Sequence, residues 1–363
     1  GALLVSSLRL TNYRNFERVE FGFHRDKTAV CGENGRGKSN LLEAIYFLAI
    51  GKSGRGARDR DVLRWGADYF SIEAVLESDG RTFPIRIAYD VKAGKKKAYL
   101  EDHPLTRLSE LIGAFNAVLF SPEDVDLVLR DPSQRRRLLD ILVSQSNTSY
   151  LADLEQYYRI LSQRNRLLKE RGRLLLSDPA QLSAWDSQLA GMGARIVCGR
   201  MDALREIQPL ASTNYDRIAS TAESLKTVYR SAVGPEDQDR AEEVLAEALR
   251  ARRSEEAQIG FTLSGPHRDH LVFTLDERAA HKFASKGQLK TALLAWKLAE
   301  ASFLESQTGK MPVLLMDDVF SELDRRRALA VLELIGDSGQ VVLTSARDPD
   351  IGLGERGCSI IDL

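Results

Sequence analysis

One stretch constrains this chain more than any other: Gly32-Glu33-Asn34-Gly35-Arg36-Gly37-Lys38-Ser39. It fits the phosphate-binding loop pattern of a Gly, four variable residues and then Gly-Lys-Ser. A strand-like apolar run ends at Cys31 before it, and a helical apolar pattern follows from Leu41. That order is the context the motif requires, because glycines and a helix N-terminus together present backbone N–H groups to phosphate oxygens. We therefore expect an α/β fold that binds ATP or GTP.

The side chains of this loop have expected roles. Lys38 would reach the β- and γ-phosphates, and the Ser39 hydroxyl would bind Mg²⁺. Further nucleotide contacts are expected at Gly32, Asn34, Gly35, Gly37 and Asn40. The alternative is a glycine-rich turn that matches by chance, but the flanking strand and helix patterns argue against it.

Length and composition fit a globular protein of about two domains. The chain has 363 residues, is 43% hydrophobic and 28% charged, and carries a formal net charge of −1. Its apolar runs are shorter than the ~20 residues that span a bilayer. Three separated cysteines lack metal spacing and predict reduced thiols. We expect a cytoplasmic protein without a membrane partner, in which any surface for nucleic acid is a local patch.

A second motif lies near the other end of the chain. The apolar run 311–316 is followed directly by Asp317 and Asp318. A buried parallel strand has this pattern, with carboxylates at its C-terminal edge, and in phosphate-binding-loop proteins that edge holds the Mg²⁺-binding Asp. We assign that role to Asp317 and expect Asp318 to polarise the attacking water. A core strand that ends in a helix cap is the plainer alternative.

Two further motifs complete an ordered set. Lys38 and Asp317 are 279 positions apart, so a large segment is inserted between them. Within it, Ser285-Lys286-Gly287-Gln288 opens an amphipathic helix, and a helix N-terminus binds anions, although Ser is a common cap. Ser321-Glu322-Leu323-Asp324 follows the acidic pair. In this order the motifs resemble the signature and D-loop of ATP-binding-cassette (ABC) ATPases, which implies nucleotide contacts at Ser285, Gly287, Gln288 and Asp324.

The insertion is predicted to be helical over about 148–207. Ser177-Asp178-Pro179 marks a helix stop and restart, since Pro favours the first helical turn. The pattern predicts an antiparallel hairpin with arms of about 25 residues, packed by a coiled-coil seam. The expected seam of the first arm includes Leu151, Leu154, Tyr158, Leu161, Asn165 and Leu168. The alternative is a set of plain amphipathic helices in a globular lobe, and the two readings are compatible.

The arm and the last motif separate the possible relatives. SMC proteins have ABC heads but coiled coils of several hundred residues, and this chain has only a stub. A transporter ATPase would carry a switch His after the strand at 340–344, where this chain has Ser345-Ala346-Arg347.

The chain resembles the bacterial RecF family of DNA-repair ATPases over essentially its whole length. The stretches that carry the resemblance are Leu10–Phe16, Phe120–Asp124, Gly265–Asp269, Gly287-Gln288 and Leu315–Asp324. The implied fold is an α/β ABC-type ATPase head, a mixed sheet plus an antiparallel β layer, with an inserted helical lobe and a short antiparallel coiled-coil arm. We expect residues 1–122 and 258–363 to form the ATPase lobe and 123–257 the helical lobe. Antiparallel strands are expected at 70–76, 83–89 and 98–101.

The resemblance also implies a function in DNA repair, recombination, replication and the SOS response. It implies an ATP-dependent homodimer that binds double-stranded and gapped DNA at single-strand/double-strand junctions, associates with the nucleoid and hydrolyses ATP weakly. The family works with RecR and RecO to help RecA load. By the same resemblance Arg14 and Asn15 lie near the nucleotide; the plainer reading is a polar turn before Phe16.

Two departures from the ABC pattern bear on catalysis. No Gln stands at 120–124 where the Q-loop is expected, and Asp318 replaces the usual Glu. Asp is one methylene shorter, so a water held by it is less well placed, which fits slow hydrolysis. The rival readings are an ABC-type ATPase without a DNA role, and a DNA clamp that uses ATP only to hold two copies together.

We hypothesise a composite site in which the Ser285–Gln288 helix start of a second copy closes on ATP·Mg²⁺ held by Lys38, Ser39 and Asp317. Candidate DNA contacts are basic clusters, although most charge runs are merely solvated. They are Lys52, Arg55, Arg58 and Arg60; Lys95–Lys97; and Arg135–Arg137. No aromatic platform for stacking single strands is predicted, so we expect backbone contacts to duplex.

Overall fold

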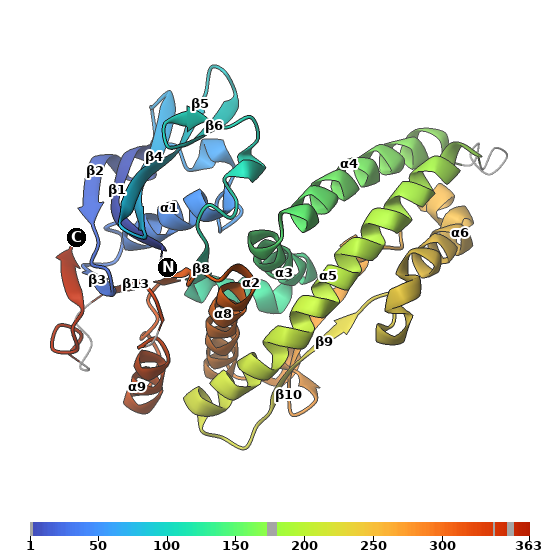
Figure 1. Ribbon diagram of the computed structural model, residues 1–363. Coiled ribbons are helices and arrows are strands. Elements are labelled where there is room, and N and C mark those ends of the chain that lie inside the picture. Colours follow the sequence, from blue (N-terminus) through green and yellow to red (C-terminus); the bar gives the residue numbers. More distant parts are fainter. Residues whose placement is uncertain (1–2, 173–179, 337, 347–351) are drawn as a thin grey trace. The chain divides into compact units, whose positions relative to one another are not determined.

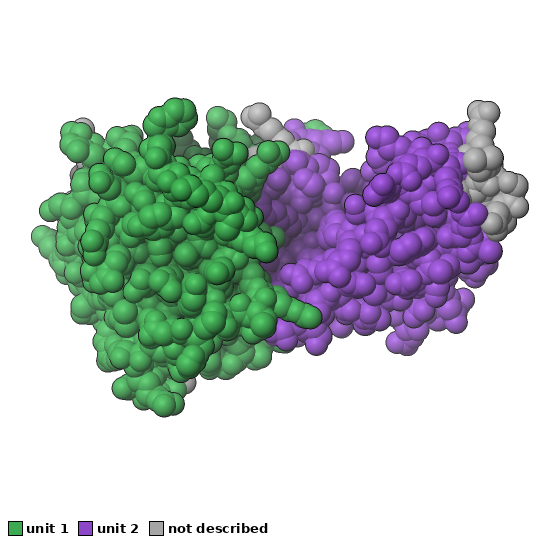
Figure 2. All heavy atoms as spheres, turned by 90° about the horizontal axis from the view of Figure 1, so that it is seen from above, with its two compact units in different colours: residues 1–127, 209–225, 283–363 green, residues 128–208, 226–282 purple. Residues whose placement is uncertain are grey.

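A computed structural model describes residues 3–172, 180–336, 338–346 and 352–363. The chain forms two compact units, coloured separately in Figure 2. Unit 1 comprises Gly1–Leu127, Pro209–Leu225 and Phe283–Leu363, and unit 2 comprises Val128–Gln208 and Lys226–Lys282. Each unit is therefore assembled from separate stretches of chain. Among the described residues, no helix combines the length and the apolar character that a membrane crossing requires.

Unit 1 contains a parallel sheet (Figure 1). Its described strands lie in the order β14-β3-β13-β12-β8 and pair in parallel. Their bounds are β3 Lys27–Cys31, β8 Ala117–Phe120, β12 Val313–Met316, β13 Val341–Ser345 and β14 Ser359–Asp362. All residues of β8, β12 and β13 are buried, as expected for a sheet covered on both faces. Because these strands are parallel, their carboxyl ends meet at one edge.

Helices of unit 1 follow directly from the sequence motifs. The α1 helix (Lys38–Ile50) begins as the glycine-rich loop ends, and α8 (Lys286–Thr308) begins at the Ser-x-Gly-Gln motif. Most residues of both helices are buried, so they are core elements rather than surface helices. The α9 helix (Arg325–Leu334) follows the D-loop motif.

An antiparallel sheet forms the second β layer of unit 1, with described strand order β2-β1-β4-β5-β6-β7. The bounds are β1 Leu3–Tyr13, β2 Phe16–Gly22, β4 Tyr69–Ser78, β5 Arg81–Asp90, β6 Lys95–Leu100 and β7 His103–Pro104. Alternate residues of β4 are buried, as a one-sided sheet requires. Edge-to-face contacts of Tyr13 and Phe70 with Phe47 join this sheet to α1. The predicted antiparallel layer is confirmed.

Unit 2 is built mainly from helices. The long elements are α2 Pro122–Arg130, α3 Pro132–Ser146, α4 Thr148–Arg171, α5 Ala180–Ala219 and α6 Ala241–Ile259. By these bounds α2 and α5 each contribute residues to both units. The short elements of the chain are α7 Ala280–Phe283, η1 Asp59–Asp61, η2 Leu108–Glu110, η4 Pro235–Arg240 and η5 Pro266–Arg268.

The antiparallel hairpin is present as α4 and α5. Asp153 pairs with Arg195 at 2.7 Å and Arg164 with Asp186 at 2.8 Å, so residue numbers rise on one helix as they fall on the other. Other helices cover it, so the hairpin belongs to a globular lobe, as the two compatible readings allow. The predicted stop and restart at 177–179 lies outside the described residues.

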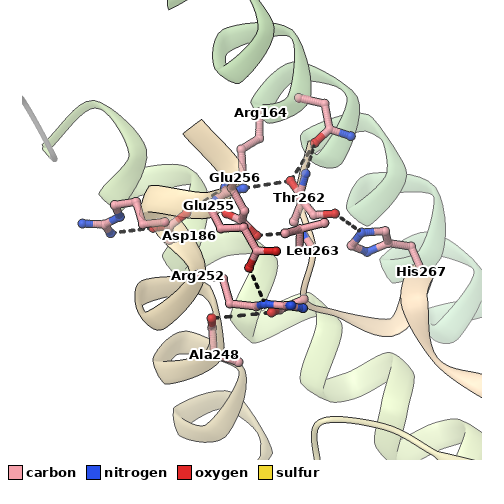
Figure 3. A network of polar contacts seen from close by, with 12 residues as sticks. Arg164, Asp186, Ala248, Arg252, Glu255, Glu256, Thr262, Leu263 and His267 are labelled. Atoms are coloured by element: carbon pink, nitrogen blue, oxygen red, sulfur yellow. Dashed lines mark hydrogen bonds and ion pairs between the residues drawn. The ribbon is translucent and has the colours of Figure 1, made fainter. Parts of the chain in front are cut away.

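The first arm differs from its predicted seam. Leu151, Leu161 and Leu168 are buried as expected, whereas Tyr158 is 43% exposed. Tyr157 and Arg164 take the central buried positions instead. Arg164 is fully buried because its guanidinium bonds Asp186, Glu256 and Thr262 (Figure 3). A satisfied charged network therefore replaces part of an apolar seam.

The second arm continues beyond the predicted end at 207. The α5 helix passes through Pro209 and reaches Ala219. A proline inside a helix removes one backbone bond and normally kinks it. Here the residues after it bury Tyr215 and Ile218 within unit 1, so tertiary packing outweighs the local propensity.

Unit 2 also holds a small sheet that the sequence did not predict, in the order β11-β10-β9. The bounds are β9 Leu225–Arg230, β10 His270–Leu275 and β11 Arg278–Ala279. The prediction assigned 209–225 to the helical lobe and 258–282 to the ATPase lobe. The compact units instead place 209–225 in unit 1 and 258–282 in unit 2. Independent folding of the two predicted lobes stays a prediction.

Candidate nucleotide-binding site

The glycine-rich loop lies between β3 and α1. Gly37 has a left-handed φ of 105°. A Cβ at this position would lie 2.6 Å from the Asn15 side chain and 2.7 Å from the Phe16 ring, so only glycine fits. In this described stretch, α1 has neither a side-chain cap nor an acidic residue in its first turn. Its first N–H groups and its positive end therefore remain available to an anion.

Lys38 folds back over the loop. Its Nζ donates to the carbonyl oxygens of Gly32 and, at 2.8 Å, Glu33. An ammonium has three donors, so these two bonds hold the group in place and leave one donor for a phosphate oxygen. Lys38 is 8% exposed, which places this charge inside the loop as predicted for a phosphate ligand.

Asn15 and Asn40 brace the loop from the side. Asn40 Nδ2 donates to Asn15 Oδ1 at 2.9 Å, and Asn15 Nδ2 donates to the Arg36 carbonyl at 3.1 Å. The turn after β1 is therefore fastened to the loop, where Asn34 and Gly35 are exposed. Asn15 lies beside the site as expected, and its direct contact with nucleotide stays a prediction.

The predicted metal ligands meet at the edge of the parallel sheet. Ser39 Oγ donates to Asp317 Oδ1 at 2.9 Å, although 278 positions separate the two residues in the sequence. A hydroxyl and a carboxylate are hard oxygen ligands, and Mg²⁺ binds to proteins through one or two such groups together with substrate phosphates. The pair fits Mg²⁺ by donor type, and its use by the metal stays a prediction.

Thr344 is a site residue that the sequence reasoning missed. Its Oγ1 donates to Asp317 Oδ1 at 2.7 Å and accepts the Asp318 N–H at 2.9 Å. It is fully buried at the end of β13, the neighbour of β12. The ABC pattern draws attention to a His after this strand, whereas the edge rule for parallel strands points to the hydroxyl near its end.

Arg55 also lies in the site rather than in a free basic cluster. Its guanidinium is 3.9 Å from Asp317 Oδ2 and 3.7 Å from both Glu43 Oε2 and Glu123 Oε2. It also bonds Asn40 Oδ1 at 3.3 Å. These ion pairs are long, so the cation neutralises the acids without being locked onto one of them. Glu123 stands in the stretch where a Q-loop Gln was sought.

Arg14 is held by the first helix. Its Nε and Nη2 bond the two oxygens of Glu43 at 3.1 and 2.8 Å, and Glu43 is almost fully buried. This bidentate pair fixes α1 against the turn after β1. The structure thus gives Arg14 a structural partner, and its predicted nucleotide contact is untested.

Asp318 has an unusual backbone conformation and a perturbed carboxyl group. It is half-buried with a left-handed φ of 46°, an uncommon conformation for a residue with a side chain. Burial raises the pKa of its carboxyl and the nearby Asp317 raises it further, while the ammonium of Lys290 opposes the shift. A raised pKa makes the carboxylate a better proton acceptor from water. Its catalytic role stays a prediction.

The Ser-x-Gly-Gln motif forms a complete helix cap. Gln288 N–H donates to Ser285 Oγ at 3.2 Å, and Ser285 N–H donates to Gln288 Oε1 at 2.7 Å. Gln288 Nε2 also donates to Glu223 at 2.5 Å. A Cβ on Gly287 would lie 3.6 Å from the Arg327 guanidinium. Ser285 is exposed, so this helix start is a surface feature of the single chain.

The D-loop is fastened to the same region. Asp324 caps α9 by accepting the Arg327 N–H at 2.9 Å, and the Lys290 ammonium donates to the Ser321 carbonyl. The structure thus gathers the predicted residues into two clusters. The first cluster contains Lys38, Ser39, Asn40, Asn15 and Asp317. The second cluster contains Ser285, Gly287, Gln288 and Asp324. Nucleotide contacts of the second cluster are untested.

Several basic clusters have structural partners. Lys96 binds Asp59 at 2.8 Å, Arg135 Nε binds the Leu271 carbonyl at 2.6 Å, and Arg136 binds the Asp269 carbonyl at 2.9 Å. Lys95 and Lys97 are exposed. The sequence reasoning found no aromatic group for a nucleic-acid surface, but Trp65 is 98% exposed at a turn.

Comparison with known proteins assigns the family. The family model described as RecF/RecN/SMC N terminal domain matches residues 4–360. A protein of Staphylococcus carnosus (strain TM300) named DNA replication and repair protein RecF is 37% identical over 345 residues, which cover 94% of this chain and 92% of that protein. Its namesake in Bacillus subtilis (strain 168) is 35% identical over 347 residues, which cover 94% and 93%.

Solved structures agree with this assignment. One described as the recombination mediator protein RecF-ATPrS in RecFOR pathway matches with a TM-score of 0.86 and 31% identity, covering 96% of this chain and 94% of that one. An Smc head bound to the C-winged helix domain of ScpA matches with a TM-score of 0.56 and 18% identity, covering 99% and 93%, which shows the fold alone. The phosphate-binding loop, signature and acidic pair thus stand on an ABC-type ATPase head, and the chain belongs to the RecF family.

Proposed function

We propose that this protein is an ATP-dependent DNA-binding protein of recombination and repair. It would dimerise on ATP, grip duplex next to single-strand gaps and hydrolyse ATP slowly. The main observation behind the proposal is the hydrogen bond of 2.9 Å from Ser39 Oγ to Asp317 Oδ1, next to Lys38. The relatives support the setting, since they are named DNA replication and repair proteins.

ATP would bind along the loop and the start of α1. Lys38 supplies its remaining donor to the β- and γ-phosphates, and the first N–H groups of α1 face the same anion. Ser39 and Asp317 would hold Mg²⁺, which neutralises phosphate charge when bound. A relative described as RecF-ATP supports ATP over GTP. The hydrogen bond from the Thr344 hydroxyl would keep the Asp317 carboxylate in position.

Asp318 would act as the general base. Water attacks the γ-phosphorus, the bond to the β–γ bridging oxygen breaks, ADP leaves, and the carboxylate takes the proton of the water. Two features support a low rate: the short side chain and the left-handed φ of 46°, which restricts how the carboxylate can move. The same features favour the second candidate, a clamp that ATP holds closed with negligible catalysis.

Two copies would share each nucleotide. The capped helix start at Ser285 is exposed and carries Gly287 and Gln288, a shape suited to a phosphate from outside the chain. A two-fold axis lets one interface complete both sites at once. ATP then favours the closed dimer because it makes contacts there that the single chain does not offer.

DNA would lie on basic surfaces that the association of two copies brings together. One candidate surface in unit 1 joins Trp65 and Tyr69 to Arg58, Lys95 and Lys97. The bond between Lys96 and Asp59 brings the β5–β6 hairpin to η1, and Val91 N–H binds the Asp68 carbonyl beside the turn of Trp65. An exposed indole can stack on bases, which suits a junction with single strand. RecR, RecO and RecA are the proposed partners at gaps, in the cytoplasm and on the nucleoid.

The proposal is tested with Ser285→Arg. We expect this variant to bind ATP like the wild type but to stay single in sedimentation with a non-hydrolysable ATP analogue. Ser302→Arg is the matched control, because Ser302 is also exposed on α8 but lies far along the helix from its start. Normal dimerisation of Ser285→Arg would refute the shared site. DNA binding is then measured with and without the analogue over a salt series, and equal binding in both refutes the clamp.

A further inference from the structure

A basic cavity in unit 2 has no role in the proposed ATP site. Its volume is about 590 Å³, within the range of about 300–1,000 Å³ for small-ligand sites. The charged and titratable residues that line it are Asp131, Arg136, Arg252, His267, Arg268 and His270. They come from α3, α6 and the segment around η5, so the fold brings together cations that are far apart in the sequence.

The cations of this cavity are incompletely paired. Arg136 Nη1 donates to the Asp269 carbonyl at 2.9 Å, and its charge also interacts with the carboxylates of Asp131 and Asp269. Arg252 Nε reaches Glu255 at 3.2 Å, and both side chains are about half exposed. Within the described part of the chain, no carboxylate lies within ion-pair distance of Arg268. The one lining acid, Asp131, caps α3 by accepting the Ser133 N–H at 2.8 Å. The lining therefore carries excess positive charge.

The wall of the cavity is rigidly supported. Glu256 binds Arg164 Nη2 and the Leu263 N–H, both at 2.7 Å, and Arg164 Nη1 binds Thr262 Oγ1 at 2.8 Å (Figure 3). Arg164 and Glu256 are fully buried, so their bonds to Thr262 and Leu263 hold the segment that leads to His267 in place. A preformed wall reduces the ordering cost of binding a ligand.

His267 forms a neutral part of the cavity wall. Its Nε2 donates to the Thr262 carbonyl, which can only accept, and its Nδ1 accepts from the Tyr157 hydroxyl at 2.7 Å. The pKa of this ring is lowered to about 4, mainly by burial and additionally by the nearby charges of Arg268 and Arg136. The ring is thus a neutral part of the wall, and the guanidinium groups supply the charge.

We propose that this cavity binds phosphate groups. Guanidinium groups bind phosphate oxygens through paired, charge-assisted hydrogen bonds, and three of them converge here from different segments. Such an anion would relieve the repulsion among cations that the protein leaves unbalanced. The phosphates belong either to a nucleic-acid backbone or to a free polyphosphate, and only the first source rests on the proposed function.

The test uses Arg268→Ala with Arg166→Ala as the matched control. Both changes remove one exposed positive charge from unit 2, but Arg166 lies on α4, is not part of the cavity lining and pairs with Glu170. The first arm measures the affinity of the full chain for a duplex of 30 base pairs with a non-hydrolysable ATP analogue, over a salt series. For a backbone site we expect Arg268→Ala to weaken binding about tenfold and to lower the salt slope by about one, with no change in the control.

The second arm measures binding of inorganic pyrophosphate by calorimetry in a Lys38→Ala background, which removes the phosphate-binding loop as a competing site. For a free polyphosphate we expect binding that Arg268→Ala weakens about tenfold and Arg166→Ala leaves unchanged. If Arg268→Ala alters neither arm relative to its control, the cavity is not a phosphate site. A wild type that binds no DNA at all refutes the proposed function, while the pyrophosphate arm still decides on the cavity.

Discussion

Two arginines, one in each unit, are paired in opposite ways. In unit 2, Arg200 is fully buried and its guanidinium bonds both oxygens of Asp140 at 2.8 and 2.9 Å and the Pro266 carbonyl at 2.8 Å. In unit 1, the Arg55 side chain is 22% exposed and approaches its acids only at 3.7–3.9 Å. One cation is saturated with short bonds, and the other is shared among acids at long range.

This difference in pairing distinguishes arginines that stabilise the fold from arginines that are available for function. A saturated buried arginine cannot change partner without leaving an uncompensated charge, so it fixes the shape of the helical unit. A loosely shared arginine next to Asp317 can exchange partners when a ligand arrives, at little cost. Pairing quality is therefore a guide to which charged residues hold the fold and which remain available for function.

Arg200→Met should give the largest loss of stability. It leaves Asp140 buried and charged without its partner, and we expect the free energy of unfolding to fall by about 3–5 kcal/mol in urea denaturation. Arg195→Met on the same helix is the control, because its ion pair with Asp153 is half-exposed and is worth less than about 1 kcal/mol. Equal losses in both variants would remove the distinction between the two kinds of arginine.

His267 should make unit 2 sensitive to acid. The pKa of its ring is about 4 in the folded chain against an ordinary 6.5, so the unfolded chain binds the extra proton between these values. The free energy of unfolding should therefore fall as the pH drops from 6.5 to about 4, by at most about 3 kcal/mol. His267→Gln should flatten this slope in denaturation measured across that range. His270→Gln, an exposed neighbour, should leave the slope as in the wild type, and identical slopes for all three proteins would contradict the assignment.

Thr344→Val should affect the site more than the fold. It removes the hydroxyl that orients Asp317, and we expect Mg²⁺-dependent ATP affinity to fall about 10- to 100-fold, the usual effect of losing such a supporting bond. Thr28→Val is the control on the neighbouring strand β3, where the lost hydroxyl accepts only the His24 N–H. Magnesium titrations that show the same loss in both variants would mean that Thr344 acts through general stability alone.

Local motifs pointed to the residues of the candidate nucleotide site. Lys38 and Ser39 follow from the loop pattern, and Asp317 follows from an apolar strand ending in acids, because parallel strands deliver their ends to one edge. Thr344 and Arg55 were not assigned to the site, since a single hydroxyl or a basic loop has no distinctive spacing. Their position depends on the packing of strands and loops that the sequence pattern does not specify.

Unit 2 was predictable in outline only. Periodicity located the hairpin, but it placed Tyr158 and Asn165 in the seam where the structure buries Tyr157 and Arg164. A charged residue is expected to be exposed unless its partners are known. The partners of Arg164, Asp186 and Glu256, lie 22 and 92 positions away. The strands β9–β11 were missed because β11 has only 2 residues and because the α6 helix separates β9 from its partner β10 in the sequence.

The ammonium of Lys290 links Asp318 to the D-loop. It lies two residues after the Ser285–Gln288 motif, donates to the Ser321 carbonyl and interacts with the charge of Asp318. If Asp318 is the general base proposed above, its protonation would remove a negative neighbour of Lys290 while the bond from Lys290 to the D-loop remains. In the proposed dimer, this lysine would therefore carry the effect of bond cleavage from the acidic pair to the signature helix and the D-loop, the two surface motifs that a second copy would touch.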